Sequence, residues 1–390
     1  MLENDYDPHK HRKQTNLSPN IETTLHIIKS CTGTGILAMP YGFKHAGLFN
    51  GITCTVFIMS FTTYCVHMLV NINCIWPSLR LIIRGNCEIT VRCQYVICKR
   101  YRIPRITYPE TLIAALTVGP KLLRPYARRA GRILEVTIVL NQGLICSVYS
   151  LFICSNVQIV VDDYLLTHYR KTVDKSFYLL ILTISFVSMT MIRTIKTHAN
   201  IALIGNCLTF FSVSVIFARS FRQWEMTSDA KLVADPINYP IFFGIAMFVL
   251  DSVSNIVAME NNMQSPKSFG GFLGVFNVSM MFFTFLVTLV GFFGYLRFGS
   301  DVLPVITLNL PAGDHVADMA RIAFALAQIL SYGMQGYIPT KLLIRRVKHS
   351  PHPLFWEYFI RVTFAVVPGK LQLNMQTVTT VTYEPTTTQL

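Results

Sequence analysis

The chain has 390 residues, of which 52% are hydrophobic and only 14% are charged. Soluble domains carry about 25% charged residues, and apolar runs of about 20 residues are long enough to cross a bilayer, so this composition excludes an ordinary soluble protein. The formal net charge of +14 would suggest nucleic acid as a partner of a soluble chain. Here the basic residues lie between apolar runs, as cytosolic loops of membrane proteins require, and we expect a lipid bilayer as the partner and no nucleic acid.

The order of polar and apolar segments predicts a multi-pass membrane protein. Residues 1–20 are polar, lack the apolar core of a signal peptide, and are expected to form a cytosolic tail. About eight spans are predicted, near 21–46, 48–70, 133–161, 176–192, 198–218, 239–258, 272–296 and 319–340. A ninth run, 354–367, is shorter and charged, which is typical of an interfacial segment. The transmembrane domain would therefore cover 21–366, followed by a Thr-rich tail at 367–390.

The distribution of Lys and Arg predicts the orientation. A basic loop is expected at 71–132, between the second and third spans. With the N-terminus in the cytosol, this loop lies inside, together with the basic segments 193–197, 259–271 and 341–361. The loops left outside are short and mixed in sign, which agrees with the positive-inside rule.

Two glycines interrupt the first apolar run. Residues 33–38, which begin with Gly33, Thr34 and Gly35, match a dinucleotide-binding fingerprint by letters but lack its strand and helix context, and Pro40 lies just beyond them. Glycines this close weaken a helix, and unwound backbone inside a bilayer is tolerated only beside protein or a water-filled cavity. The pattern predicts either the broken helix of a transporter site or a packing kink.

The sixth span carries an acid. Asp251 lies three residues after Phe248 and directly before Ser252. Placing its charge at the bilayer centre would cost about 2.5–3.5 kcal/mol or more. Such residues usually face an interior pathway, and we interpret Asp251 as functional rather than as a hydrogen-bonded core residue. His26 lies before the glycines, where it could carry a proton or simply be a core residue.

No enzyme chemistry is indicated. The ten Cys residues show neither zinc spacing nor the pattern of a secreted disulfide framework. No nucleophile–base set or phosphate loop fits its context. We expect no catalytic residue, no metal and no cofactor.

Several segments together resemble the amino acid/auxin permease family, and within it the proton-coupled amino acid transporters of insects. The resemblance lies in residues 24–29, 33–40, 108–111, 119–120, 148–152, 259–263, 266–267, 291–296 and 306–311. It implies an all-α fold of two inverted five-helix repeats with broken first and sixth helices. It also implies symport of protons with small neutral amino acids, at the plasma membrane or the lysosomal membrane.

The resemblance assigns roles to the residues singled out above. His26 matches the family's proton-coupling histidine. The substrate pocket would be lined by Gly33, Thr34, Gly35, Phe248, Asp251 and Ser252. The size of Phe248 then favours substrates the size of alanine or glycine over aromatic ones.

Three departures from the family are visible. Asp251-Ser252 stand where the family has Glu-Gly, residues 71–91 have no counterpart, and the match stops near Val366. The second repeat would then be incomplete, and poor transport by this form is expected. The alternatives are sodium coupling, a non-transporting amino-acid sensor, or an inactive truncated isoform.

Overall fold

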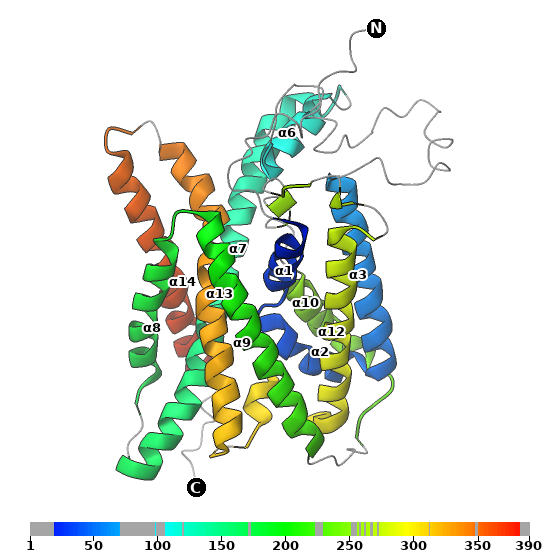
Figure 1. Ribbon diagram of the computed structural model, residues 1–390, viewed down its shortest axis with the longest axis vertical. Coiled ribbons are helices and arrows are strands. Elements are labelled where there is room, and N and C mark those ends of the chain that lie inside the picture. Colours follow the sequence, from blue (N-terminus) through cyan, green and yellow to red (C-terminus); the bar gives the residue numbers. More distant parts are fainter. Residues whose placement is uncertain are drawn as a thin grey trace. The chain divides into compact units, whose positions relative to one another are not determined.

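The computed structural model describes residues 19–70, 98, 106–118, 121–170, 173–222, 229–250, 256, 259–260, 263–265, 268–270, 273–311, 313–347 and 350–382. Within these ranges every regular element is a helix, so the all-α prediction is confirmed (Figure 1). The α-helices are α1 (Asn20–Cys31), α2 (Met39–Ala46), α3 (Leu48–Val70), α6 (Tyr108–Val118), α7 (Ala127–Tyr169), α8 (Lys175–Thr190), α9 (Ile195–Arg222), α10 (Tyr239–Val249), α12 (Val275–Phe298), α13 (His315–Val347) and α14 (Pro353–Thr382). The 3-10 helices are η1 (Thr34–Ala38), η3 (Arg124–Tyr126), η4 (Pro236–Asn238), η6 (Gly299–Asp301) and η7 (Ile306–Asn309). The two inverted repeats stay a prediction.

Three helical stretches among the described residues are long and apolar enough to cross a membrane: Leu48–His67, Arg124–Tyr169 and Val275–Asp301. Shorter apolar helices occur at Lys175–Thr190, Leu203–Arg219 and Pro236–Val249. The other expected spans fall in helices that are shorter or less apolar. For example, α13 has ample length but carries buried polar side chains such as Gln328 and Arg321.

Large apolar side chains lie exposed along α7, which is the pattern of a helix that faces lipid. Ile133, Leu140 and Leu144 are 66%, 63% and 55% exposed. Soluble monomers rarely expose such a continuous apolar surface. This exposure agrees with the membrane assignment.

Two segments are more helical than the sequence suggests. The ninth run was expected to be short and interfacial, but α14 continues through Pro368 to Thr382 and so includes part of the expected Thr-rich tail. The expected loop at 71–132 contains α6, whose helix packs against the start of α7 because Gly131 leaves room for the side chain of Ile113.

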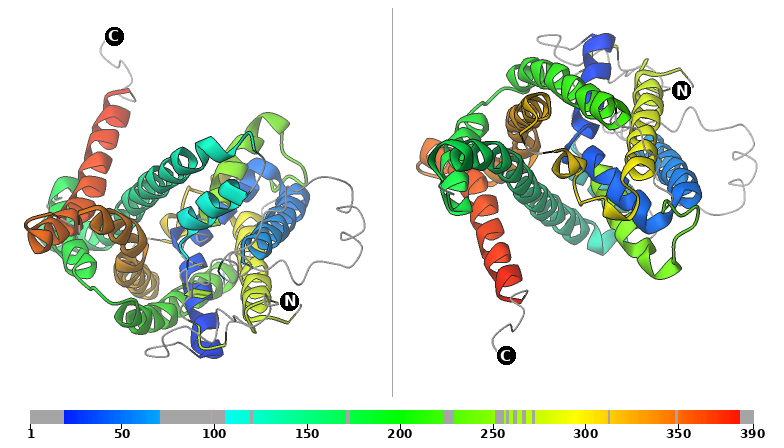
Figure 2. Two further views of the ribbon diagram at one scale, coloured as in Figure 1. Left: turned by 90° about the horizontal axis from the view of Figure 1, so that it is seen from above. Right: turned by 90° about the horizontal axis from the view of Figure 1, so that it is seen from below.

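The chain divides into two compact units. The first comprises residues 1–138 and 229–295, and the second comprises residues 139–228 and 296–390. In the first unit, α10 contacts η1, α2, α3 and η4. In the second, α13 contacts α8, α9 and α14, and α14 also packs against α8 (Figure 2).

Phe43 of α2 anchors the packing of the first unit. Its side chain is fully buried and meets Phe242 of α10 edge to face, with 6.4 Å between the ring centroids. A Cβ added to Gly51 or Gly291 would come within 2.7 Å and 2.5 Å of the Phe43 ring. These two glycines therefore let α3 and α12 approach the ring from different sides.

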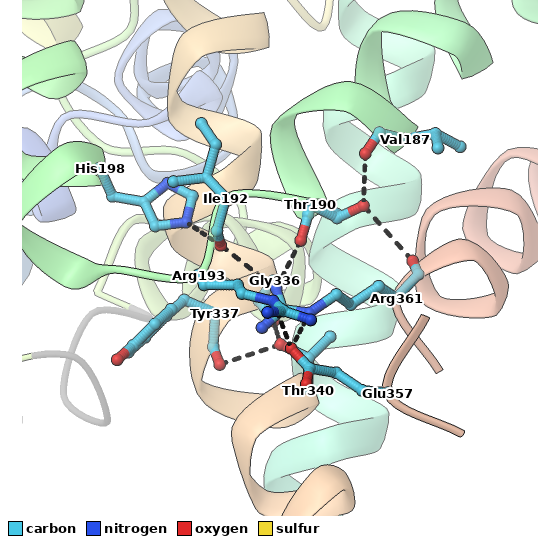
Figure 3. A network of polar contacts seen from close by, with 10 residues as sticks. All are labelled: Val187, Thr190, Ile192, Arg193, His198, Gly336, Tyr337, Thr340, Glu357 and Arg361. Carbon is cyan, nitrogen blue, oxygen red and sulfur yellow. Dashed lines mark hydrogen bonds and ion pairs between the residues drawn. The ribbon is translucent and has the colours of Figure 1, made fainter. Parts of the chain in front are cut away.

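A buried arginine connects α14 to the C-terminal end of α8 (Figure 3). Arg361 of α14 donates through Nη1 to the carbonyl oxygens of Thr190, at 2.6 Å, and Ile192, at 3.2 Å. These carbonyls lie at and just beyond the C-terminal end of α8, where the helix leaves acceptors unpaired and favours a cation. Glu357 accepts from Arg361 Nε at 3.2 Å and pairs with Arg193 Nε at 3.0 Å.

The turn between α8 and α9 packs closely against α13 at a glycine. His198, at the start of α9, contacts the carbonyl oxygen of Ile192 through Nε2 at 3.2 Å. A Cβ on Gly333 of α13 would stand 2.6 Å from His198 Cε1 and 2.8 Å from the carbonyl oxygen of Met189. The backbone of α13 therefore passes directly over this corner.

Candidate substrate-binding site

The first helical region of the first unit is broken where the sequence predicts. The helix α1 ends at Cys31, and Thr32 closes it by donating both its N–H, at 2.7 Å, and its hydroxyl, at 2.6 Å, to the carbonyl oxygen of Ile28. Gly33 is then extended, with φ −94° and ψ −164°. The helical path resumes only with the 3-10 turn that begins at Thr34. The backbone of residues 32–33 thus leaves the helix inside a buried segment.

The helix after the break begins with a proline. Pro40 is the second residue of α2, which starts at Met39. Proline has no N–H to offer, and the first turn of a helix needs none, so Pro40 favours a new start here rather than a continuous helix. The two glycines and Pro40 together account for the break.

The break packs against the C-terminal end of α10. A Cβ added to Gly35 would lie 2.8 Å from Val249 Cγ2, 3.0 Å from Phe248 Cδ1 and 3.2 Å from Val249 Cα. The last of these atoms belongs to the backbone and has little freedom to move away. Position 35 therefore requires glycine because a Cβ would collide with α10.

A hydroxyl group is left without a partner at the same place. Thr34 is 2% exposed, and no described residue offers a hydrogen-bond partner to its buried Oγ1. Burying a hydroxyl without a partner costs roughly 1–3 kcal/mol, and such groups in native proteins usually serve a ligand or an ordered water. Thr34 is therefore a candidate ligand contact.

Four of the six expected pocket residues are brought together. Gly33, Thr34 and Gly35 form the break, and the half-buried Phe248 touches it from α10. Asp251 and Ser252 lie outside the described residues. The assignment of all six residues to a substrate pocket stays a prediction.

The candidate proton carrier has a carboxylate partner. His26 is 6% exposed, and its Nε2 lies 3.3 Å from Oε1 of Glu22, one turn earlier on α1. The other ring nitrogen, Nδ1, is buried and has no partner among the described residues. A carboxylate on one side stabilises the protonated ring, and the unpaired nitrogen leaves a place where a proton can be accepted or released.

Sequence reasoning missed two residues of this site. Glu22 was not assigned a role, although its spacing of four residues from His26 places both on one helix face. Val249 was not recognised because its role is to meet a glycine from a distant segment, for which one sequence carries no signal. Lys29, one turn after His26, is also buried, at 2% exposed.

The described residues hold no group of three or more His, Cys, Asp or Glu side chains that could bind a metal ion. The described residues at the break contribute backbone, a hydroxyl and an aromatic ring, and the histidine–carboxylate pair lies about two turns earlier on α1. This donor set suits a small zwitterion and a proton.

Comparison with known proteins places the chain in a family. Residues 18–368 match the family model described as "Transmembrane amino acid transporter protein". The chain is 28% identical over 370 residues to the "Proton-coupled amino acid transporter-like protein pathetic" of Drosophila melanogaster, covering 93% of this chain and 73% of that protein. It is 22% identical over 343 residues to "Vacuolar amino acid transporter 4" of Saccharomyces cerevisiae, covering 86% of this chain and 42% of that protein. The chain belongs to the transmembrane amino acid transporter family, a class of integral membrane transporters and not of enzymes.

Proposed function

We propose that this protein is a secondary transporter that moves small neutral amino acids together with protons across a membrane. The observation that carries the proposal is the break at residues 32–35, where unwound backbone and the unpartnered Thr34 hydroxyl meet the end of α10. Broken helices of this kind form substrate sites at the membrane midplane in many transporters. The names of the two relatives, one proton-coupled and one vacuolar, support amino acids as the substrate class.

The polarity of the helix ends suits an amino acid. The C-terminal ends of α1 and α10, at Cys31 and Val249, carry partial negative charge from their last carbonyl groups. Such ends attract the ammonium group of a substrate. The Thr34 hydroxyl would then donate a hydrogen bond to the carboxylate.

The proton would be carried by His26. Its neutral ring can accept a proton at the buried Nδ1, and Glu22 stabilises the charge that results. Release toward the cytosol would follow when the site opens inward. The pH gradient then drives uptake, and a membrane potential adds about 2.3 kcal/mol per charge for each 100 mV.

Flux measured in proteoliposomes tests the proposal. Uptake of labelled alanine by the purified chain, which is expected to be slow, should be faster when the outside is acidic, and replacing sodium by choline should leave the rate unchanged. Loss of uptake without sodium would establish sodium coupling instead. Alanine binding without any uptake would favour the alternative of a non-transporting amino-acid sensor.

Competition tests the substrate size. Unlabelled glycine and alanine should compete with labelled alanine more strongly than tryptophan does. Because Phe248 lies against the break, Phe248→Ala should improve competition by tryptophan relative to alanine. Stronger competition by tryptophan than by alanine in the unmodified protein would contradict the proposed pocket.

The proposed location is the plasma membrane or the lysosomal membrane, with the N-terminus in the cytosol. The orientation is supported by the basic segments, as the positive-inside rule requires. An epitope placed before residue 19 should be reached by antibody only after cells are permeabilised. Staining of intact cells would reverse the proposed orientation at the cell surface.

A further inference from the structure

A basic surface precedes the membrane-spanning part of α7, and the proposed transport mechanism does not use it. It combines exposed cations with exposed apolar side chains, in η3, in the turn before η3 and in the first turns of α7. We define this α7 basic surface as Lys121, Leu122, Tyr126, Arg128, Arg129 and Arg132. Leu122 and Tyr126 are 80% and 54% exposed.

The charges of this surface are not balanced within the described part of the chain. The structure gives Arg128, Arg129 and Arg132 no ion pair with the residues that it describes, and Lys121 likewise has none. Arg128 and Arg132 are four residues apart, a spacing at which like charges on a helix repel. No acidic residue lies in the first turn of α7.

Helix stability does not explain these cations. Arg128 and Arg129 lie in the first turn of α7, where positive side chains oppose the partial positive charge of the helix start and destabilise the helix. The sequence therefore places cations where the helix alone disfavours them. A negatively charged group from outside the chain would remove both the repulsion among the arginines and the conflict with the helix.

The position along α7 identifies where that group comes from. The apolar stretch after Glu135 runs from Val136 to Val161, about 26 residues that rise roughly 39 Å, enough for a tilted helix to cross a hydrocarbon core of about 30 Å. Arg132 lies about 6 Å before this stretch and Arg128 about 12 Å before it. These are the depths at which lipid headgroups lie, and Leu122 and Tyr126 supply the apolar and aromatic contacts that interfaces favour.

We propose that the α7 basic surface binds the headgroups of anionic phospholipids on the cytosolic side of the membrane. Clusters of four to eight Lys and Arg beside a membrane helix attract anionic lipids by about a factor of five per cation. The guanidinium groups would bind the phosphate oxygens by paired hydrogen bonds. The side chain of Ile113 of α6 packs against Gly131, which lies between Arg129 and Arg132 on α7. The helix α6 lies beside the start of α7 (Figure 1).

Lipid titration of the detergent-purified full chain, followed by native mass spectrometry, tests this proposal. The probe is dioctanoyl phosphatidylserine, with dioctanoyl phosphatidylcholine as the neutral lipid and inorganic phosphate as the soluble anion. The chain should bind phosphatidylserine more tightly than phosphatidylcholine. The triple variant Arg128→Gln, Arg129→Gln, Arg132→Gln should weaken phosphatidylserine binding on the order of a hundredfold.

Two matched variants separate this site from general effects of charge or folding. The variant Arg128→Lys, Arg129→Lys, Arg132→Lys keeps the charge and should retain most of the affinity. The variant Arg170→Gln, Lys231→Gln, Lys370→Gln removes three exposed cations elsewhere and should bind as the unmodified chain does. Unchanged affinity in the first triple variant, equal loss in the control, or full competition by inorganic phosphate would each overturn the proposal.

Discussion

The backbone of Gly35 in η1 packs against the side chain and the Cα of Val249 in α10. A Cβ added to Gly35 would lie 2.8 Å from Val249 Cγ2 and 3.2 Å from Val249 Cα. The two residues are distant in sequence, yet one marks the break after α1 and the other the last turn of α10. This contact places the break after α1 beside the C-terminal end of α10.

Replacing Gly35 should therefore damage the site before any other part of the first unit. We expect Gly35→Ala to destabilise the protein by about 1–3 kcal/mol through overpacking, and to abolish most alanine uptake. The matched control is Gly244→Ala on α10, where an added Cβ meets nothing within 4 Å. Thermal unfolding in detergent and uptake in proteoliposomes measure both effects, and equal behaviour of the two variants would show that the Gly35 contact is unimportant.

The unpartnered hydroxyl of Thr34 should contribute to substrate affinity. Thr34→Val keeps the shape but removes the hydroxyl, and the loss of one hydrogen bond should raise the KM for alanine by roughly 2- to 12-fold. Thr55 on α3 offers a control, because it is also buried at 1% exposed and its Oγ1 also has no partner among the described residues. Thr55→Val should leave KM unchanged. A Thr34→Val variant with normal KM would remove Thr34 from the proposed site.

His26 should be responsible for stimulation of uptake by external acid. His26→Ala should abolish the stimulation while the protein still reaches the membrane, and Glu22→Gln should reduce it, because the carboxylate 3.3 Å away stabilises the protonated ring. His168, exposed near the end of α7, provides a control that should keep normal pH dependence when replaced by Ala. If His26 is only a packed core residue, its replacement will lower expression and leave the pH dependence of the remaining flux intact.

Much of the fold could be predicted because its signals are local. The apolar runs indicated membrane helices, and the closely spaced glycines with Pro40 indicated the break, since glycine and proline act on the backbone within one turn. The sequence shows glycines at positions 51 and 291, but it does not show that they lie against two sides of the Phe43 ring. That relationship depends on three segments that only the folded chain brings together.

The features that sequence reasoning missed are those set by tertiary contacts. The length of α14 is one of them, because a run containing Glu357 and Arg361 looks too polar to cross a membrane. In the structure Glu357 and Arg361 bind each other, Arg361 also binds the carbonyl oxygen of Thr190 at the end of α8, and Glu357 also binds Arg193, so their polarity is satisfied within the protein. Buried charged residues with partners in distant segments mislead any estimate based on hydropathy alone.

Arg361 should be more important for stability than its neighbour Arg193, although both bind Glu357. The Arg361 side chain is 7% exposed and also binds the carbonyl oxygens of Thr190 and Ile192, whereas the Arg193 side chain is 47% exposed. Removing a buried partner leaves acceptors without water or a donor, so Arg361→Met should cost about 3 kcal/mol or more. The exposed pair is screened by solvent, and Arg193→Met should cost less than about 1 kcal/mol.

Thermal unfolding of the purified protein in detergent measures the difference between these two variants. Both substitutions remove one positive charge and keep an unbranched side chain, so a general effect of charge would lower the two unfolding temperatures equally. Arg361→Lys provides a further comparison, because an ammonium group keeps the charge at the end of α8 but cannot bind Glu357 and two carbonyl groups with a planar fork. Its unfolding temperature should lie between those of Arg361→Met and the unmodified protein. Equal losses in Arg361→Met and Arg193→Met would show that the buried arginine does not hold α14 to the end of α8.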